Sequence, residues 1–333
     1  MRIAFFGTSE FALPALQALV NNNTAPIAVI TAPDKPKGRG QHVRHPQIKQ
    51  WLVTSDQRVG KAKNIQVFQP ENLDSDFVLQ ISNLKPDVGI VAAYGKILPK
   101  ALIELFPRSA LNIHPSLLPQ YRGPSPIQTT LLNGDKEMGV TIITIDEKMD
   151  HGPIVAQQQL GGGYRIPPDI TYPALHNTLA ELGAQLLIET LPKWIAGDIT
   201  PTPQDDTKAT YTKLLKKKDG KINWSKSAEE IERMVRAYNP WPGSFSEIKN
   251  QKSPASPSEA GRTKIKNILK IKKAEVLKEM AASPLPPIPG TFFKTTNGFP
   301  AVICGKSALK LLVVQPEGKN EMPGDAFARG YMK

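Results

Sequence analysis

The sequence is poor in cysteine, and this scarcity excludes several classes of protein. Among 333 residues there is one cysteine, Cys304. A single thiol cannot build an internal disulfide framework or a multi-cysteine metal site, and such poverty is typical of proteins from a reducing cytoplasm. Cys304 ends the strand-like run AVIC, so we expect a buried structural thiol there and not a nucleophile.

Long hydrophobic runs are also missing. No stretch approaches the ~18 consecutive apolar residues that cross a bilayer. The apolar first twenty residues contain Glu10 and Pro14, which argues against a secretory signal. We therefore expect a globular cytoplasmic protein without membrane association, and nothing in the sequence demands more than a monomer. A chain of this length, with 40% hydrophobic residues, is expected to form two domains.

The first two thirds of the chain have no surplus of positive charge. Up to Asp206 there are 18 Lys and Arg against 19 Asp and Glu, whereas from Thr207 onward the counts are 24 and 11. The net charge of +12 therefore originates in the C-terminal third. A surplus so localised predicts a polyanionic partner, first of all a nucleic acid, with a solubilising surface as the alternative.

Short apolar runs alternate with helical periodicity over the first two hundred residues. The strand-like runs are 2–7, 26–33, 65–70, 87–95, 110–116, 139–146 and 153–160. This alternation predicts an α/β fold with a doubly wound, mostly parallel sheet, whose ligands bind beyond the carboxyl ends of the strands. The first turn, GTSEFALP, keeps only Gly7 of a G-x-G-x-x-G fingerprint, so we expect no nicotinamide dinucleotide.

The second part of the chain has a different pattern. A long amphipathic helix over 172–195 and a polar, turn-rich segment over 197–207 come before it, so we place the domain boundary between residues 206 and 207. Short β-like runs separated by Gly, Pro and Asn then predict a small antiparallel, OB-like barrel over 207–333. The Ser/Pro-rich stretch 250–262 is expected to be a mobile loop without chemistry.

Three polar side chains are expected to converge near the stretch HPSLLPQYRGPSP, residues 114–126. Asn112 and His114 are two apart on a predicted strand, so they share one face at its carboxyl end. The next predicted strand runs into EKMDHGP, which places Asp150 at the corresponding edge of the sheet. An amide, an imidazole and a carboxylate would then meet there.

This trio suits transfer of an acyl group to an amine without a covalent enzyme intermediate. Asn112 and a protonated His114 could donate to the developing oxyanion, at about 3–4 kcal/mol per donor. Asp150 would favour the protonated imidazole and accept the proton that the amine loses. The four prolines of the stretch 114–126 would hold the loop against the donor site.

The same residues allow other interpretations. An Asn-x-His pair is often purely structural. His114, Asp150 and His151 could form a metal site, but their spacing matches no ligand pattern, and we expect no metal. Ser116 and Ser125 lack the G-x-S-x-G elbow of a hydrolase nucleophile.

The long loop motif resembles a known family. LNIHPSLLPQYRGPSPIQ followed by GVTIITIDEKMDHGPIV is similar to the signature of formyltransferases that use 10-formyltetrahydrofolate as co-substrate. The resemblance implies that Asn112, His114 and Asp150 are the catalytic trio. It also implies a folate-contacting loop made of Ser116, Leu117, Leu118 and Pro119. Lys148 and His151 depart from the small residues expected around the aspartate, which puts only details of that loop in doubt.

Three further stretches resemble the methionyl-tRNA formyltransferases within that family. They are TAPDKPKGRGQ (31–41), VRAYNPWPGSF (235–245) and ALKLLVVQPEGKNEMPGDAFARG (308–330). The resemblance implies formyl transfer to the α-amino group of methionine on initiator tRNA, a step of translation initiation. An amine nucleophile fits a trio without Cys or Ser, and a tRNA partner fits the basic C-terminal third.

A basic segment in the otherwise neutral first part points to the same partner. Residues 34–49 hold five Lys and Arg against one Asp. The resemblance implies a loop that grips the tRNA acceptor end through Lys35, Lys37, Arg39 and Arg44, with Arg39 central; a solvated loop is the alternative.

Related activities compete with this interpretation. Glycinamide ribonucleotide formyltransferase shares the trio but acts on a small phosphorylated amine and lacks a basic second domain. A formyltetrahydrofolate hydrolase or a sugar-amine formyltransferase would also use the trio, which cannot by itself distinguish water from different amines. An RNA-binding module on an inactive α/β scaffold is the alternative from another class.

Overall fold

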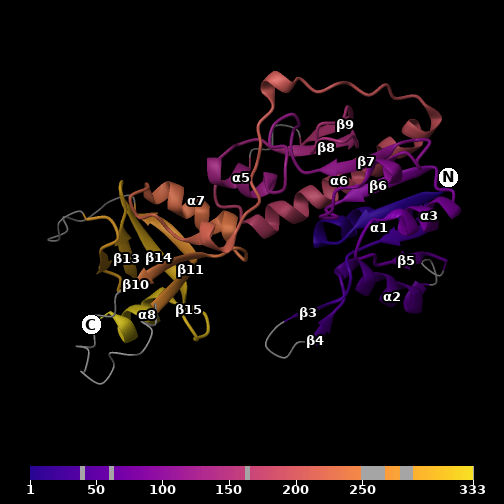
Figure 1. The fold of residues 1–333 in the computed structure, drawn as a ribbon. Helices are drawn as coiled ribbons and strands as arrows, with labels where there is room; N and C mark the ends of the chain where they lie inside the picture. Colours follow the sequence, from indigo (N-terminus) through magenta and orange to yellow (C-terminus); the bar gives the residue numbers. More distant parts are fainter. Residues whose placement is uncertain (38–41, 60–63, 162–165, 249–266, 278–287, 333) are drawn as a thin grey trace. The chain divides into compact units, whose positions relative to one another are not determined.

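The computed structural model describes residues 1–333 except 38–41, 60–63, 162–165, 249–266, 278–287 and 333 (Figure 1). The described chain divides into two compact units. The first contains Met1–Pro126, Lys136–Ile166 and Ala174–Lys213, and the second contains Ile127–Asp135, Pro167–Pro173 and Leu214–Lys333. The boundary between residues 206 and 207 stays a prediction. The Ser/Pro-rich stretch 250–262 lies outside the described residues.

The first unit is built on a seven-stranded sheet. Its strands are β1 (Ile3–Gly7), β2 (Ala28–Ile30), β5 (Gln66–Phe68), β6 (Val88–Ala92), β7 (Ala110–His114), β8 (Gly139–Thr144) and β9 (Ile154–Gln159). They lie in the order β5-β2-β1-β6-β7-β8-β9. The first five are parallel, whereas β8 is antiparallel to β7 and β9 to β8. The predicted mostly parallel α/β sheet is confirmed.

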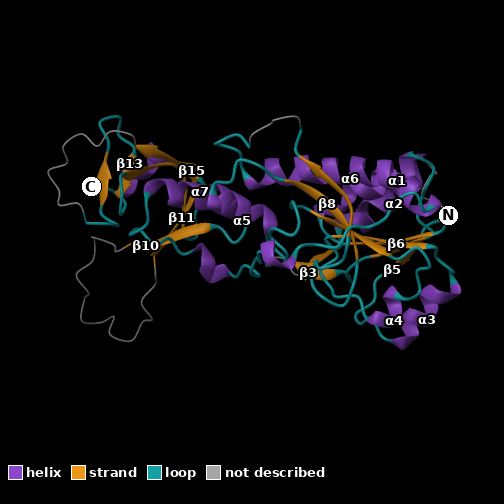
Figure 2. Cartoon of the chain, turned by 90° about the horizontal axis from the view of Figure 1, so that it is seen from above, coloured by secondary structure: helices purple, strands orange, loops and turns teal. Residues whose placement is uncertain are grey.

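Helices cover both faces of this sheet. They are α1 (Leu13–Asn21), α2 (Gln47–Val59), α3 (Ser75–Asn83), α4 (Lys100–Ile103) and α6 (Tyr172–Ala196), with the 3₁₀ turns η1 (Glu10–Ala12) and η2 (Asp206–Lys208). Figure 2 shows α1 and α6 on one side of the sheet and α3 and α4 on the other. α6 lies so close to β7 that a Cβ at Gly183 would come within 2.8 Å of Ile113 Cγ2. The absence of a side chain at Gly183 therefore allows α6 to pack closely against β7.

The alternation of side chains along β7 directs two polar residues to the α3/α4 side. Ala110 belongs to the core that includes Phe77 of α3 and Leu102 of α4, while Ile113 meets α6. Because side chains alternate between faces along a strand, Asn112 and His114 share the face of Ala110. They lie where β7 ends, beyond the apolar core.

The described residues of the second unit form an antiparallel sheet with three helices. Its strands are β10 (Ser244–Ile248), β11 (Asn267–Leu277), β12 (Phe292–Lys294), β13 (Pro300–Ile303), β14 (Ala308–Pro316) and β15 (Met322–Pro323). The order is β10-β11-β14-β13-β12, with β15 added on β14. Within the part of the chain that the structure describes, no pairing joins β10 to β12, so the antiparallel sheet is confirmed but its closure into a barrel is not.

Two segments that come before residue 174 in the sequence belong to this second unit. Its helices are α5 (Pro126–Asn133), α7 (Ala228–Tyr238) and α8 (Gly324–Tyr331), with η3 (Lys217–Gly220). The α7 residue Arg233 donates through Nε to the Leu132 carbonyl at 2.9 Å, and Arg236 donates through Nη1 to the Ile170 carbonyl at 2.8 Å. These two arginines explain why 127–135 and 167–173 group with a domain that follows them by many residues.

The expected burial of Cys304 is confirmed. Cys304 is buried beside β13, and burial raises the pKa of its thiol to about 12, as suits a structural residue. None of the helices that the structure describes has the length and apolarity required to span a membrane.

Candidate active site

The structure brings Asn112, His114 and Asp150 together. Asn112 Nδ2 donates to Asp150 Oδ1 at 3.2 Å, and His114 Nδ1 lies 3.6 Å from Asp150 Oδ2. The His114 side chain is buried, whereas the other two residues are half-buried. An amide, an imidazole and a carboxylate therefore surround a common point at the end of β7.

The expected route of Asp150 to this point was wrong. β8 is antiparallel to β7, with His114 opposite Thr141 and Leu111 opposite Thr144, so β8 ends beside the beginning of β7. Asp150 reaches the other end through the loop 145–153, which turns back so that Thr144 N donates to the Pro153 carbonyl at 3.0 Å. An apolar run specifies a strand but not its direction, which is why the sequence pattern could not show this.

The carboxylate of Asp150 is held from two sides. Besides the Asn112 amide, the backbone N–H of Gly123 donates to Oδ2 at 2.8 Å. The Asp150 backbone has φ of 50°, in the left-handed region that non-glycine residues rarely adopt. Gln204 Nε2 donates to the carbonyls of Asp150 at 2.9 Å and of Gly152 at 2.8 Å. The carboxylate is thus fixed both by its own oxygens and through its backbone.

The two nitrogens of His114 have different surroundings. Nε2 lies 2.9 Å from the Tyr121 carbonyl. A carbonyl can only accept, so we assign the proton of the neutral imidazole to Nε2. Nδ1 is consequently the nitrogen that faces Asp150 and the open site.

The loop that follows β7 is braced from inside. Ser116 is buried and donates through Oγ to the Gln120 carbonyl at 2.6 Å. Thr141 Oγ1 donates to the Ser116 carbonyl at 2.6 Å and accepts from Leu118 N at 3.1 Å. Gln157 Nε2 donates to the Leu118 carbonyl at 2.9 Å. Sequence reasoning missed Thr141 and Gln157. Thr141 could have been found as a polar residue inside the apolar run of β8, whereas Gln157 is one of three consecutive glutamines in β9 and gives no such signal.

The four predicted folate-contacting residues differ in exposure. The side chains of Ser116 and Leu118 are buried in the protein, whereas Leu117 and Pro119 are half-buried. A ligand would therefore meet Ser116 and Leu118 mainly through their backbone. The folate-contacting role of this loop stays a prediction.

Arg122 is the most prominent residue that sequence reasoning passed over. Its side chain is 1% exposed, and Nη2 pairs with Asp206 Oδ1 at 2.7 Å. Nε and Nη2 donate to Gln204 Oε1 at 3.0 and 2.9 Å, and Nη1 donates to the Tyr211 hydroxyl at 3.2 Å. Burial alone would lower the pKa of Arg122, but the hydrogen bonds with Asp206 and Tyr211 outweigh it and raise the pKa. The guanidinium therefore stays charged while tying the loop to residues 204–211.

The side chain of His151 does not join His114 and Asp150 in a metal site. Its Nδ1 lies 2.6 Å from Asp146 Oδ2 and its Nε2 lies 3.4 Å from Asp206 Oδ2. His151 thus engages different carboxylates from His114. Among the residues that the structure describes, no group of three or more His, Cys, Asp or Glu side chains is arranged to hold a metal ion.

The basic segment forms a hairpin outside the main sheet. β3 (Lys35–Lys37) pairs with β4 (His42–Arg44), with Lys35 opposite Arg44 and Lys37 opposite His42. Lys35 is exposed. Arg39 lies outside the described residues, as do the side chains of Lys37 and Arg44, so their contact with tRNA stays a prediction.

A charged cluster anchors the base of this hairpin. Asp34 Oδ2 accepts from Lys49 Nζ at 2.6 Å and lies 2.8 Å from His45 Nδ1. Gln69 Nε2 donates to Asp34 Oδ1 at 2.7 Å, and Lys49 also donates to Gln69 Oε1 at 2.6 Å. Hydrogen bonds from Gln69 and Lys49 lower the pKa of the Asp34 carboxyl to about 2. The two ends of the hairpin are thereby joined to α2 and to the end of β5.

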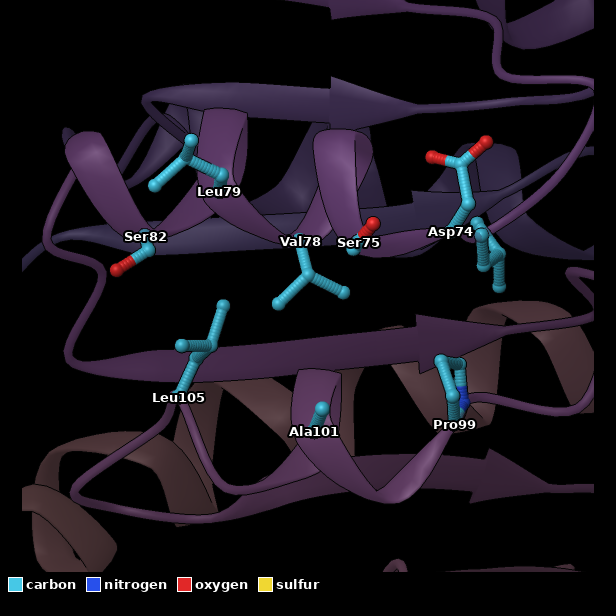
Figure 3. Close-up of a pocket in the computed structure, with 9 residues that line it drawn as sticks. Asp74, Ser75, Val78, Leu79, Ser82, Pro99, Ala101 and Leu105 are labelled. Carbon is cyan, nitrogen blue, oxygen red and sulfur yellow. The ribbon is translucent and has the colours of Figure 1, made fainter.

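A pocket elsewhere in the first unit is not the candidate site. It has a volume of about 490 Å³ and lies between α3 and α4, with Val78, Leu79, Ala101 and Leu105 among its lining (Figure 3). None of the predicted site residues lines it. Its lining is mostly apolar, and the carboxylate of Asp74 at its edge accepts from Phe77 N at 3.1 Å as the N-cap of α3.

Comparison with known proteins assigns the class of the chain. Residues 1–191 match the family described as "Formyl transferase", and residues 214–332 match "Formyl transferase, C-terminal domain". Both units thus have counterparts in one family of enzymes. The trio of Asn112, His114 and Asp150 lies within the first match.

A full-length relative narrows the class. The methionyl-tRNA formyltransferase of Chloroflexus aurantiacus (strain ATCC 29366 / DSM 635 / J-10-fl) is 41% identical over 332 residues, covering 99% of this chain and 97% of the relative. The chain therefore belongs to the formyl transferase family, and this similarity places it among the methionyl-tRNA formyltransferases.

Solved structures share the fold at lower identity. An N-formyltransferase from Helicobacter canadensis, in complex with folinic acid and dTDP-3-aminofucose, has a TM-score of 0.60 at 20% identity, covering 93% of this chain and 99% of that one. HypX from Aquifex aeolicus, in complex with tetrahydrofolic acid, has a TM-score of 0.62 at 15% identity and matches 100% of this chain, which spans about half (48%) of HypX. At these identities the likeness is one of fold.

Proposed function

We propose that the protein transfers the formyl group of 10-formyltetrahydrofolate to the α-amino group of methionine on initiator tRNA. The observation that carries the proposal is the meeting of Asn112, His114 and Asp150 at the end of β7. The proposal is supported by the 41% identity of the chain, along its length, to a methionyl-tRNA formyltransferase. We further propose the cytoplasm as its location and the monomer as its working form.

The choice of formyl donor rests on the neighbours in fold. Two of them were solved with folate derivatives, tetrahydrofolic acid and folinic acid. In this chain the proposed wall of the folate site is the loop Ser116–Pro119, which Thr141 and Gln157 hold rigid from within. A rigid wall suits a planar ligand because little conformational freedom is lost on binding.

Asn112 and His114 are proposed to stabilise the oxyanion. One N–H of the Asn112 amide is directed to Asp150, so the second is left for the formyl oxygen. His114 would act as the imidazolium, which carries a second N–H at Nδ1, since the N–H at Nε2 is engaged by the Tyr121 carbonyl. Preorganised donors of this kind lower the barrier by about 3–4 kcal/mol each, because they need no reorganisation as charge develops.

Asp150 is proposed to manage the proton of the attacking amine. The methionine nitrogen forms a bond to the formyl carbon, and the bond from that carbon to the folate nitrogen breaks. The proton lost by the amine passes to the Asp150 carboxylate, directly or through water, and the departing folate nitrogen takes one up. Gly123 and Asn112 hold the carboxylate in place for this transfer.

The basic regions are proposed to bind the tRNA. Residues 207–333 hold 24 Lys and Arg against 11 Asp and Glu, and the antiparallel sheet there is proposed to form part of an OB-like barrel. The hairpin residues Lys35, Lys37, Arg39 and Arg44 are proposed to grip the acceptor end. Lysine and arginine bind phosphates with little regard to sequence, so this surface would supply affinity and not base specificity.

The test is an acceptor competition. Protein and 10-formyltetrahydrofolate carrying a labelled formyl group are mixed with methionyl-tRNA, with glycinamide ribonucleotide and with a nucleotide-linked amino sugar in separate reactions. Label is expected on methionyl-tRNA alone. Label on one of the small amines, or formate released without transfer, would overturn the proposal.

A further inference from the structure

The position of Asp150 depends on its backbone. Its φ of 50° is unfavourable for a residue with a side chain, so surrounding contacts must hold it. The carbonyls of Asp150 and Gly152 both accept from the single amide of Gln204, at 2.9 and 2.8 Å. One side chain thus fixes the chain on either side of His151.

Gln204 is itself oriented by a buried charge. Its Oε1 accepts from Arg122 Nε at 3.0 Å and from Nη2 at 2.9 Å. A guanidinium can only donate, so the oxygen of the amide must face Arg122 and the NH₂ must face the two carbonyls. Arg122 is 1% exposed and is also anchored by Asp206 and Tyr211, so it cannot easily turn away.

The same arginine also lies next to the donor that holds the carboxylate. Gly123, the residue after Arg122, donates its backbone N–H to Asp150 Oδ2 at 2.8 Å. The backbone of Arg122 is fixed in turn, because its N–H donates to the Thr210 carbonyl at 2.9 Å and its carbonyl accepts from Thr212 N at 2.8 Å. Arg122 therefore reaches Asp150 by two paths, through Gln204 to its backbone and through Gly123 to its carboxylate.

We propose that Gln204, oriented by Arg122, is a positioning residue for the reaction: it holds Asp150 at the distance from His114 and Asn112 at which the carboxylate accepts the proton of the amine. This inference rests on the proposed role of Asp150. Small displacements of an acid–base group reduce the rate steeply, since a shift of about 1 Å costs on the order of 100-fold. The role requires the NH₂ of Gln204, whereas a mere brace between chain segments would require only its contact with Arg122.

Two substitutions separate these roles. Gln204→Glu keeps the shape and the acceptor for Arg122 but replaces the NH₂ by an oxygen, which repels both carbonyls. Gln204→Met removes the donor and the acceptor together. The matched control is Gln80→Glu, which makes the same chemical change at an exposed position of α3.

The measurements are kcat and KM for methionyl-tRNA together with the thermal midpoint. Both Gln204 variants are expected to lose about 10- to 100-fold in kcat, with KM for methionyl-tRNA changed by less than about two-fold. Gln204→Met should lower the thermal midpoint more than Gln204→Glu does, by roughly 3 °C, since only the Met variant also removes one of the acceptors of Arg122. Gln80→Glu should behave as wild type.

Retention of wild-type kcat by Gln204→Glu would overturn the inference, as would a loss of kcat confined to Gln204→Met. A failure of the proposed function itself would look different, because the wild-type protein would then transfer no formyl group to methionyl-tRNA. Should Gln204→Glu fail to fold, Gln204→Met still decides: normal kcat in that variant contradicts the proposal.

Discussion

The imidazole of His114 divides its two nitrogens between the fold and the proposed chemistry. Nε2 is bound to the Tyr121 carbonyl of the rigid loop, and Nδ1 faces Asp150. A buried side chain with one nitrogen held this way cannot turn over without losing that hydrogen bond, at about 0.5–1.5 kcal/mol. The orientation of the imidazole is thus part of the fold and does not depend on a ligand.

This division predicts different effects for two amide substitutions of His114. The nitrogen of a glutamine amide can occupy the place of Nε2, and that of an asparagine amide the place of Nδ1. His114→Gln should keep the bond to Tyr121 and a near-normal thermal midpoint but lose roughly 100-fold or more in kcat, since the donor at Nδ1 is gone. His114→Asn should retain more activity and less stability. Single-turnover rates and thermal midpoints of the two variants check this, and wild-type kcat in His114→Gln would contradict the role of Nδ1.

At the scale of elements, charged and polar contacts at Asp34 hold the base of the basic hairpin β3–β4. Asp34 receives Lys49 and Gln69 and lies against His45, so contacts at one carboxylate join the hairpin to the sheet. β3 and β4 pair with each other and are not strands of the seven-stranded sheet. Its orientation should therefore respond to changes at Asp34.

Asp34→Asn should loosen the hairpin in a pH-dependent manner. The folded-state pKa of about 2 lies below the ordinary value of 3.8, so the carboxylate stabilises the fold above about pH 4, and this contribution is lost as pH falls toward 2. At pH 7 we expect a lower thermal midpoint and a KM for methionyl-tRNA raised several-fold, with kcat little changed. The difference in thermal midpoint should shrink between pH 4 and pH 2.

The control is Asp198→Asn, which removes an exposed carboxylate just after α6. It should leave both the thermal midpoint and KM near their wild-type values. A constant difference between Asp34→Asn and wild type across the pH range would show that the carboxylate of Asp34 contributes nothing through its ionisation.

The sequence predicts features of single strands correctly but does not predict how distant segments pair. Alternation along 110–116 was enough to put Asn112 and His114 on one face, because a strand's period is local. The direction of β8 is not local, since an antiparallel pair and a parallel pair can have the same apolar run. The partners of Arg122 are 82 to 89 residues away in sequence, so no pattern in one chain could reveal that a Pro/Gly-rich loop buries a guanidinium.

On the scale of the whole molecule, charge and chemistry are separated along the sequence. The trio lies in residues with nearly balanced charge, whereas the surplus of Lys and Arg follows residue 207. The antiparallel sheet carries exposed lysines, among them Lys270 and Lys273 of β11. This separation suits an enzyme that binds a large polyanion with one region and reacts with its end in another.

The affinity for tRNA should therefore depend steeply on salt. Binding to about six phosphates predicts a roughly 1,000-fold weaker affinity at 200 mM than at 50 mM salt, because each neutralised phosphate releases counterions. Replacing Lys270 and Lys273 by Gln should reduce the slope of log K against log salt by about 0.7–0.9 for each phosphate that these lysines neutralise. Lys193→Gln on α6 is the matched control. Binding assays over a salt series check this, and a flat response would mean that these lysines only keep the protein in solution.

The carboxylate of Asp150 is proposed to take the proton of the amine in a site shared with Asn112 and His114. The direct measurement is the single-turnover rate of formyl transfer to methionyl-tRNA by Asp150→Asn, with tRNA and folate binding measured alongside. A rate about 100- to 10,000-fold below wild type is expected, with both ligands still bound. A rate equal to wild type would contradict this role of Asp150.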